Sequence, residues 1–343
     1  MNNFAWVAPR TAAEAAAAAS AVVADAMTAA PEAMGREEAA ILKAGGIDLL
    51  DLLKENLLAP TRLVNLRDVP GLDAIVEEGG GLRIGATASL AAVAEHPLVR
   101  RRYPALSDAL AGSASPQIRH VATLGGNLLQ RPRCWYLRAQ EHRCLRKGGS
   151  HCFAVDGENQ YHAIFDNQVC AIVHPSTAAT VLVALGAAVE LIDAQGATRS
   201  VALEDFLVPP QRDLRRENDL KPREILAAVR LPPLPASVRM AHLKQGEKDS
   251  FDWPLADVAV VVELAPDGNC RRASVVLGAA APMPHRAKSA EQALAGKRID
   301  ESIARQAASA ALAGATPLAK NAYKLPLFET LVRRALTKAL ALG

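Results

Sequence analysis

The chain contains 343 residues, of which half are apolar and only 4% are aromatic. Its 39 basic and 36 acidic residues leave a formal net charge of +3, which is too small to indicate a nucleic-acid surface unless the charges cluster. No apolar stretch approaches the roughly 18 residues that a membrane-spanning helix requires, and the N-terminal segment lacks the basic start and apolar core of a secretory signal. We therefore expect two or three globular domains without membrane insertion, in the cytoplasm, or in the periplasm if an exported partner carries the chain.

The first part of the chain is predicted to alternate between helices and strands. Apolar periodicity and capping residues place helices over 11–30 and 47–55 and strands over 39–44, 62–66 and 82–86. Ser89 predicts the N-cap of a further helix that ends at Pro97. Gly45-Gly46 joins the strand at 39–44 to the helix at 47–55, so the local order is strand, diglycine turn, helix.

A second diglycine turn, Gly125-Gly126, is predicted to close the segment 118–124. Between about 131 and 170 regular periodicity disappears, and basic, glycine and cysteine residues predict an irregular insertion. Ser176 predicts the N-cap of a helix that runs to residue 187. The remaining predicted elements are a hairpin over 188–203, a proline-rich linker at 231–235, paired strands at 255–264 and 273–277, and helices over 289–295, 301–313 and 325–342.

The two diglycine segments are candidates for binding a phosphate. Adjacent glycines let backbone amides approach a bulky anion without a Cβ in the way, and a following helix N-terminus adds partial positive charge. Two such segments could together hold one dinucleotide, although a diglycine after a strand is also common as a simple tight turn. The usual nucleotide motifs lack support, because no Gly-x-Gly-x-x-Gly follows a strand and the one Gly-Lys step, Gly296-Lys297, is followed by Arg298.

Four of the five cysteines lie between residues 134 and 170, which suggests metal ligands rather than a disulfide framework. Their spacings of nine, seven and seventeen residues do not match the short knuckle of structural zinc sites, and four thiolates suffice for a [4Fe-4S] cluster. Zinc and unligated thiols remain alternatives. Six cationic residues surround the first two cysteines, and only Glu141 opposes them: Arg131, Arg133, Arg138, Arg143, Arg146 and Lys147. Their positive charge would stabilise an anionic cluster and raise its reduction potential.

Several segments together resemble one known family. Residues 44–50, 82–87, 123–128 and 174–176 occur in the order and spacing of the FAD-binding medium subunits of the xanthine dehydrogenase and carbon monoxide dehydrogenase family. The resemblance runs over nearly the whole chain and includes residues 251–255 and 321–324. The insertion is similar to that of a subgroup, the bacterial aldehyde oxidoreductases and 4-hydroxybenzoyl-CoA reductases, which carries an additional [4Fe-4S] cluster.

The resemblance implies the fold and its division into domains. The expected fold class is α+β, with a two-part FAD-binding fold of the vanillyl-alcohol-oxidase type followed by a C-terminal α+β domain that contains an antiparallel sheet. The FAD-binding domain is expected over 1–235, in subdomains of about 1–58 and 59–235 with the iron-sulfur insertion at about 131–170. The C-terminal domain is expected over 236–343.

The resemblance also implies the residues that bind each cofactor. FAD is expected to contact Lys43, Ala44, Gly45, Gly46, Ile47, Asp48, Leu49, Thr123, Leu124, Gly125, Gly126, Asn127, His174 and Ser176. The [4Fe-4S] cluster is expected on Cys134, Cys144, Cys152 and Cys170, with Cys270 outside the site and with His142 and His151 as solvated or supporting groups. The chain departs from the family at Ile47, where a hydroxyl residue is usual, and at Thr177, where an aspartate is usual.

By the same resemblance, the chain is an electron-transfer subunit of a heterotrimeric molybdenum hydroxylase. A large molybdopterin-containing partner would oxidise the organic substrate, a small [2Fe-2S] partner would relay electrons, and the FAD on this chain would pass them to an external acceptor. No catalytic residue that touches the organic substrate is expected here. Two alternatives remain: an iron-sulfur scaffold subunit that has lost FAD, and a flavin oxidase that acts alone.

Overall fold

The computed structural model describes residues 3–28, 39–248 and 251–341. These residues form two compact units, and each unit is assembled from separate stretches of the chain. Unit 1 comprises Met1–Leu90, Gln117–Phe153 and Ala187–Leu231, and unit 2 comprises Ala91–Pro116, Ala154–Gly186 and Pro232–Gly343. In the described part of the chain no helix is both long enough and apolar enough to cross a membrane.

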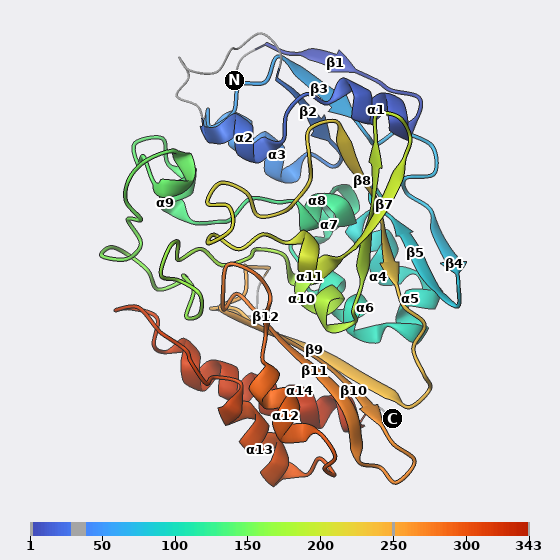
Figure 1. Cartoon of the computed structure of the whole chain (residues 1–343), viewed down its shortest axis with the longest axis vertical. Helices are drawn as coiled ribbons and strands as arrows, with labels where there is room; N and C mark the ends of the chain where they lie inside the picture. The colour runs from blue at the N-terminus through green and yellow to red at the C-terminus, as the bar shows by residue number, and fades with distance from the viewer. Residues whose placement is uncertain (1–2, 29–38, 249–250, 342–343) are drawn as a thin grey trace. The chain divides into compact units, whose positions relative to one another are not determined.

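Unit 1 begins with a small parallel sheet of three strands in the order β1-β3-β2. The strands are β1 (Ala5–Val7), β2 (Ala40–Lys43) and β3 (Arg62–Asn65), and the accompanying helices are α1 (Ala12–Ala18), α2 (Val23–Thr28) and α3 (Ile47–Lys54) (Figure 1). The buried leucines of α3, Leu49, Leu52 and Leu53, pack with Ile41 of β2 and Leu63 of β3. The predicted order of strand, diglycine and helix at 39–55 is thereby confirmed.

The single helix predicted over 11–30 is wrong, because the described part of this segment forms two short helices. The chain leaves the helical conformation at Ala19, whose backbone is extended. The Ser20 backbone N–H then donates to the Ala40 carbonyl at 3.1 Å, and the Ser20 hydroxyl accepts from the Ala40 N–H at 2.9 Å. This pairing with the start of β2 interrupts the alanine run. The end of the predicted helix, at residues 29 and 30, lies outside the described residues.

The second sheet of unit 1 is antiparallel, with five strands in the order β4-β5-β8-β6-β7. Its strands are β4 (Ile75–Glu78), β5 (Gly81–Gly85), β6 (Ala188–Asp193), β7 (Thr198–Ala202) and β8 (Glu224–Leu231). The predicted hairpin at 188–203 is confirmed as β6 and β7, whereas β4 and β8 were not predicted. Unit 1 also holds α7 (Pro116–Val121), α8 (Leu124–Leu128), α9 (Trp135–Arg138), the 3-10 turn η1 (Leu145–Lys147) and α11 (Leu203–Phe206).

The second diglycine does not form a separate turn as predicted. It lies in the first turn of α8, and the segment before it is the helix α7. Thr123 is the N-cap of α8, and its hydroxyl accepts from the Gly126 backbone N–H at 3.2 Å. The threonine hydroxyl therefore starts a helix at the point where the glycines suggested a turn.

Unit 2 is built on an antiparallel sheet with the order β12-β11-β10-β9. Its strands are β9 (Val238–Gln245), β10 (Ala256–Leu264), β11 (Cys270–Gly278) and β12 (His285–Arg286). The helices α12 (Lys288–Leu294), α13 (Glu301–Ala310) and α14 (Lys324–Ala341) share an apolar core with this sheet (Figure 1). The predicted strand pair and the three C-terminal helices are confirmed, although α13 ends earlier than predicted.

The remaining helices of unit 2 are α4 (Leu90–Glu95), α5 (Pro97–Arg102), α6 (Pro104–Ala111) and α10 (Thr177–Ala184). Ser176 is the N-cap of α10 as predicted, because its hydroxyl accepts from the Ala179 N–H at 3.0 Å. Helix α4 ends before Pro97 as predicted, and Pro97 itself opens α5. Proline is well suited to the first position of a helix, since its missing N–H would have no partner there.

Candidate functional site

The two diglycine segments belong to unit 1, and the first packs on the residues that lead into the second. A Cβ added at Gly45 would lie 2.2 Å from the Val121 carbonyl oxygen and 3.1 Å from the Ala122 Cα. Real Cβ atoms do not approach other atoms so closely, so this backbone contact requires glycine. The structure thus brings Gly45 next to the end of α7, directly before Thr123 and the second diglycine.

The second diglycine is equally confined by its neighbours. A Cβ added at Gly125 would lie 2.8 Å from the Ala86 Cβ, and the Gly125 N–H donates to the Ala86 carbonyl at 2.8 Å. Nearby, the Asn127 N–H donates to the Thr123 carbonyl at 2.8 Å. Backbone from three parts of the chain, around residues 45, 86 and 125, is therefore closely packed in one region of unit 1.

The first diglycine also leaves the start of α3 open. Gly46 adopts a left-handed conformation with φ of +82° and serves as the N-cap of α3 without a side chain to cap it. Uncapped N–H groups at a helix N-terminus favour an anion, because they point along the positive end of the helix dipole. Lys43, just before the diglycine, lies with its ammonium 5.3 Å from the Trp6 ring centre, and burial lowers its pKa.

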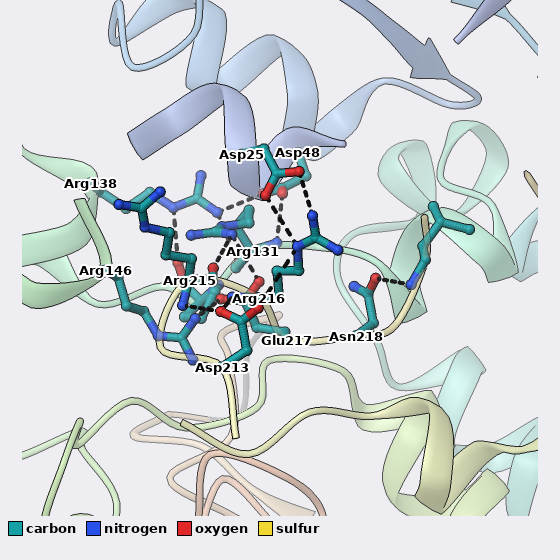
Figure 2. Close-up of polar contacts among 12 residues, drawn as sticks. Asp25, Asp48, Arg131, Arg138, Arg146, Asp213, Arg215, Arg216, Glu217 and Asn218 are labelled. Carbon is teal, nitrogen blue, oxygen red and sulfur yellow. Dashed lines mark hydrogen bonds and ion pairs between the residues drawn. The ribbon is translucent and has the colours of Figure 1, made fainter. Parts of the chain in front are cut away.

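The carboxylate of Asp48, in the first turn of α3, is held by residues of the insertion (Figure 2). It accepts from the Arg131 backbone N–H at 2.8 Å, from the Arg138 guanidinium at 2.6 Å, and from Arg133. Burial raises the pKa of Asp48, but the charges of Arg133 and Arg138 outweigh burial and hold it below its usual value. Arg138 also pairs with Asp51, one helical turn further along α3, at 2.6 Å.

The guanidinium groups of two arginines of the insertion share one carboxylate inside unit 1 (Figure 2). Arg131 and Arg146 are each 1% exposed, and Glu217 is 4% exposed. One oxygen of Glu217 lies 3.0 Å from Arg131, and the other lies 2.5 Å from Arg146. The Arg131 guanidinium also donates to the Arg215 carbonyl at 2.9 Å.

The expectation that Glu141 alone opposes the cations of the insertion is therefore wrong. Asp48 and Asp51 come from α3, and Glu217 comes from the loop before β8, so all three are far from the insertion in sequence. They neutralise much of the positive charge that was expected to surround the cysteines. Burial lowers the pKa of Lys147, and the nearby Cys144 and Cys134 oppose part of that lowering.

Three of the four candidate cluster cysteines, Cys134, Cys144 and Cys152, belong to unit 1. Burial raises the pKa of the Cys134 thiol to about 12, and the neighbouring sulfurs of Cys144 and Cys152 add to this rise. Cys170 belongs to unit 2. The five cysteines form no disulfide, and the described residues contain no group of three or more His, Cys, Asp or Glu side chains arranged to hold a single metal ion.

The histidines beside these cysteines take part in aromatic packing. His142 lies with its ring centre 5.1 Å from those of Tyr136 and Phe153, and the His151 ring lies 5.3 Å from that of Phe153. Cys270, expected outside the site, is fully buried in the apolar core of unit 2. In the insertion, the rings of Tyr136, His142, His151 and Phe153 form a small aromatic cluster.

The remaining predicted cofactor residues, His174 and Ser176, lie in unit 2. The His174 backbone N–H donates to the Ala281 carbonyl at 2.9 Å, and its Nδ1 accepts from the Ser176 N–H at 3.3 Å. Both side chains are buried. His174 and Ser176 therefore lie at the N-terminal end of α10.

Comparison with known proteins identifies the family to which the chain belongs. Residues 2–234 match the FAD binding domain in molybdopterin dehydrogenase, and residues 241–339 match the CO dehydrogenase flavoprotein C-terminal domain. The chain therefore belongs to the FAD-binding subunits of the molybdenum hydroxylase family, and it is an oxidoreductase subunit. The expected fold class, an α+β FAD-binding fold followed by a domain with an antiparallel sheet, is confirmed.

Individual relatives agree with this assignment. The chain is 38% identical over 301 residues to the aldehyde oxidoreductase FAD-binding subunit PaoB of Escherichia coli K12, covering 87% of this chain and 91% of that protein. It is 28% identical over 302 residues to the carbon monoxide dehydrogenase medium chain of Afipia carboxidovorans, with 87% and 88% covered. In structure it is similar to carbon monoxide dehydrogenase from Hydrogenophaga pseudoflava, with a TM-score of 0.72, 26% identity, and 99% and 98% of the two chains covered.

Proposed function

We propose that this chain is the electron-transfer subunit of a heterotrimeric molybdenum hydroxylase that carries one FAD and one [4Fe-4S] cluster. A large molybdopterin subunit oxidises the organic substrate, a small [2Fe-2S] subunit passes the electrons on, and this chain delivers them to an external acceptor. The observation that carries the proposal is the close packing of the two glycine segments in unit 1. The match to the FAD-binding family model over residues 2–234 supports it.

FAD, when bound, accepts electrons singly or in pairs, which suits it to link one-electron clusters to other acceptors. We assign its diphosphate to the backbone of residues 43–49 and 123–127. Gly45 and Gly125 keep Cβ atoms out of the packed region, and the uncapped start of α3 offers N–H groups to the phosphates. Ile47 contributes only its backbone, since its side chain has no hydroxyl. His174 and Ser176 are assigned to the flavin as well.

For the cluster, we assign Cys134, Cys144 and Cys152 as three ligands and Cys170 as the fourth. Cys134 and Phe153, the residue after Cys152, both pack against the apolar cluster that contains Cys144, which supports this assignment. Four thiolates are the usual ligand set of a [4Fe-4S] cluster. Zinc is the alternative occupant, and it would give a colourless site.

We further propose that the FAD-binding domain spans 1–235, with the insertion at about 131–170, and that the C-terminal domain spans 236–343. The two family models, which meet between residues 234 and 241, support this division. The aldehyde oxidoreductase relative makes an aldehyde a suitable first substrate to test on the assembled complex.

The test is to express the chain alone and together with its two proposed partners, and to measure flavin, iron and acid-labile sulfide in each preparation. For the chain alone we expect one FAD, about four irons and little substrate oxidation. With both partners present we expect activity, together with the additional iron of the [2Fe-2S] subunit. Substrate turnover by the isolated chain would contradict the subunit assignment. Iron-sulfur absorption without flavin would favour the scaffold alternative.

A further inference from the structure

Asp48 lies in an unfavourable place for a phosphate-binding site. It is in the first turn of α3, two residues after the diglycine to which the FAD diphosphate is assigned. A bare carboxylate there would repel the diphosphate, since like charges a few ångströms apart at a partly buried site change affinity by on the order of tenfold or more. Something must offset this charge if the start of α3 is to attract an anion.

The structure supplies that offset from the insertion. The Arg138 guanidinium lies 2.6 Å from the Asp48 carboxylate, and Arg133 contacts the same oxygen. The side chains of Asp48, Arg133 and Arg138 are 16%, 22% and 12% exposed, so water screens these charges only weakly. The two cations leave the start of α3 without net negative charge.

The same contacts fix the insertion in place. Arg138 donates to the carbonyls of Arg131 and Pro132, each at 3.0 Å, and so ties the chain on both sides of Cys134 into one turn. The Arg131 N–H donates to the other Asp48 oxygen at 2.8 Å. Asp48 is therefore the point at which the stretch that carries the first cysteine is attached to α3.

We propose that Asp48, Arg133 and Arg138 form an electrostatic clamp that serves both cofactor segments. The arginines cancel the carboxylate beside the FAD diphosphate, and the carboxylate holds the cysteine-bearing turn against α3. The inference rests on the proposed function. It makes Asp48 a positioning residue whose side chain binds the insertion rather than the flavin.

The clamp predicts an asymmetry that general structural damage would not produce. Replacing both arginines, R133Q with R138Q, leaves the carboxylate uncancelled, so FAD affinity falls by about tenfold or more. D48N removes the negative charge, so FAD affinity is kept or increased while the insertion loses its anchor. The triple variant D48N/R133Q/R138Q removes all three charges and regains FAD affinity relative to the double variant.

The experiment uses the full chain in complex with its partners, or alone if it is soluble. Flavin-depleted protein is titrated with FAD and followed by flavin fluorescence, and iron and labile sulfide are measured on the same samples. R133Q alone, which leaves Arg138 on Asp48, should give a smaller loss of FAD affinity than the double variant and provides a milder test if the double variant does not fold. R216Q is the matched control, because Arg216 pairs with Asp25 in unit 1 at 2.6 Å and does not contact Asp48.

The inference predicts that FAD affinity falls in R133Q/R138Q and recovers in the triple variant, and that D48N loses iron more readily than R216Q. Equal FAD affinity in all variants, or an equal loss in D48N and R133Q/R138Q, would overturn the clamp while leaving the proposed function intact. Absence of FAD binding by the unmodified protein would instead overturn the proposed function, and the clamp with it.

Discussion

Replacing Glu217 by glutamine is expected to destabilise unit 1 strongly. Each Glu217 oxygen holds one arginine, at 3.0 Å from Arg131 and 2.5 Å from Arg146, and all three side chains are nearly or fully buried. A glutamine carries no charge, and its NH₂ group would face one of the two guanidinium groups. Both arginines would then be buried cations that have lost the carboxylate of Glu217.

The expected loss follows from the burial of the three groups. Removing one partner of a buried ion pair typically costs about 3–5 kcal/mol, because a charge is left uncompensated at low dielectric. For a unit of this size, about 1 kcal/mol lowers the melting temperature by roughly 2–4 °C, so E217Q should melt about 6–20 °C lower. The measurement is thermal unfolding followed by circular dichroism, together with urea unfolding.

Two controls make this result interpretable. D108N breaks the exposed pair of Asp108 with Lys338, 3.1 Å apart, and should change stability by less than about 1 kcal/mol. The apolar triple variant R131M/R146M/E217L should be much more stable than E217Q, since well-packed apolar groups often replace a buried ion cluster without loss. A loss of less than about 1 kcal/mol in E217Q would refute the reasoning, because the arginines would then not depend on Glu217.

Three further predictions concern other parts of the chain. G45A should weaken FAD binding by about tenfold or more in a fluorescence titration, because its Cβ would lie 2.2 Å from the Val121 carbonyl. G112A should not, because Gly112 in unit 2 has a right-handed backbone and a Cβ there would come no closer than 3.3 Å to another atom. C134S should lose most of its iron and sulfide while C270S keeps both, and equal iron in the two would contradict the ligand assignment. Burial, together with the charge of Lys324, lowers the pKa of His162 to about 4, so the unfolded chain binds the extra proton and the free energy of unfolding should fall as pH drops from 6.5 to 4. Urea unfolding at pH 6.5 and pH 4 measures this fall in the free energy of unfolding, which should be smaller in H162Q than in the unmodified protein by up to about 3 kcal/mol. An equal fall in the two proteins would exclude the effect.

Local sequence patterns predicted the elements that depend on neighbouring residues. The strand at 40–43, the diglycine and the helix at 47–54 follow from apolar spacing and glycine chemistry, and Ser176 identifies the start of α10 by its capping hydroxyl. Local signals failed where a distant partner decides the outcome. The alanine run breaks at Ala19 because Ser20 pairs with Ala40, twenty residues further along the chain.

The same distinction between local and distant signals applies to the residues of the candidate site. Gly45 and Gly125 could be selected from sequence, because their freedom from a Cβ is a property of the residue itself. The pairing of Asp48 with Arg133 and Arg138, and of Glu217 with Arg131, could not be selected, since each joins residues more than eighty positions apart. The sequence shows an excess of arginine in the insertion, but only the fold shows which carboxylates pair with these arginines.

The most direct test of the central claim is an experimental structure of the FAD-loaded protein. We predict that oxygens of the FAD diphosphate accept hydrogen bonds from backbone N–H groups of both segments, 43–49 and 123–127. Density for FAD elsewhere in the protein, or a diphosphate that contacts neither glycine pair, would contradict the account.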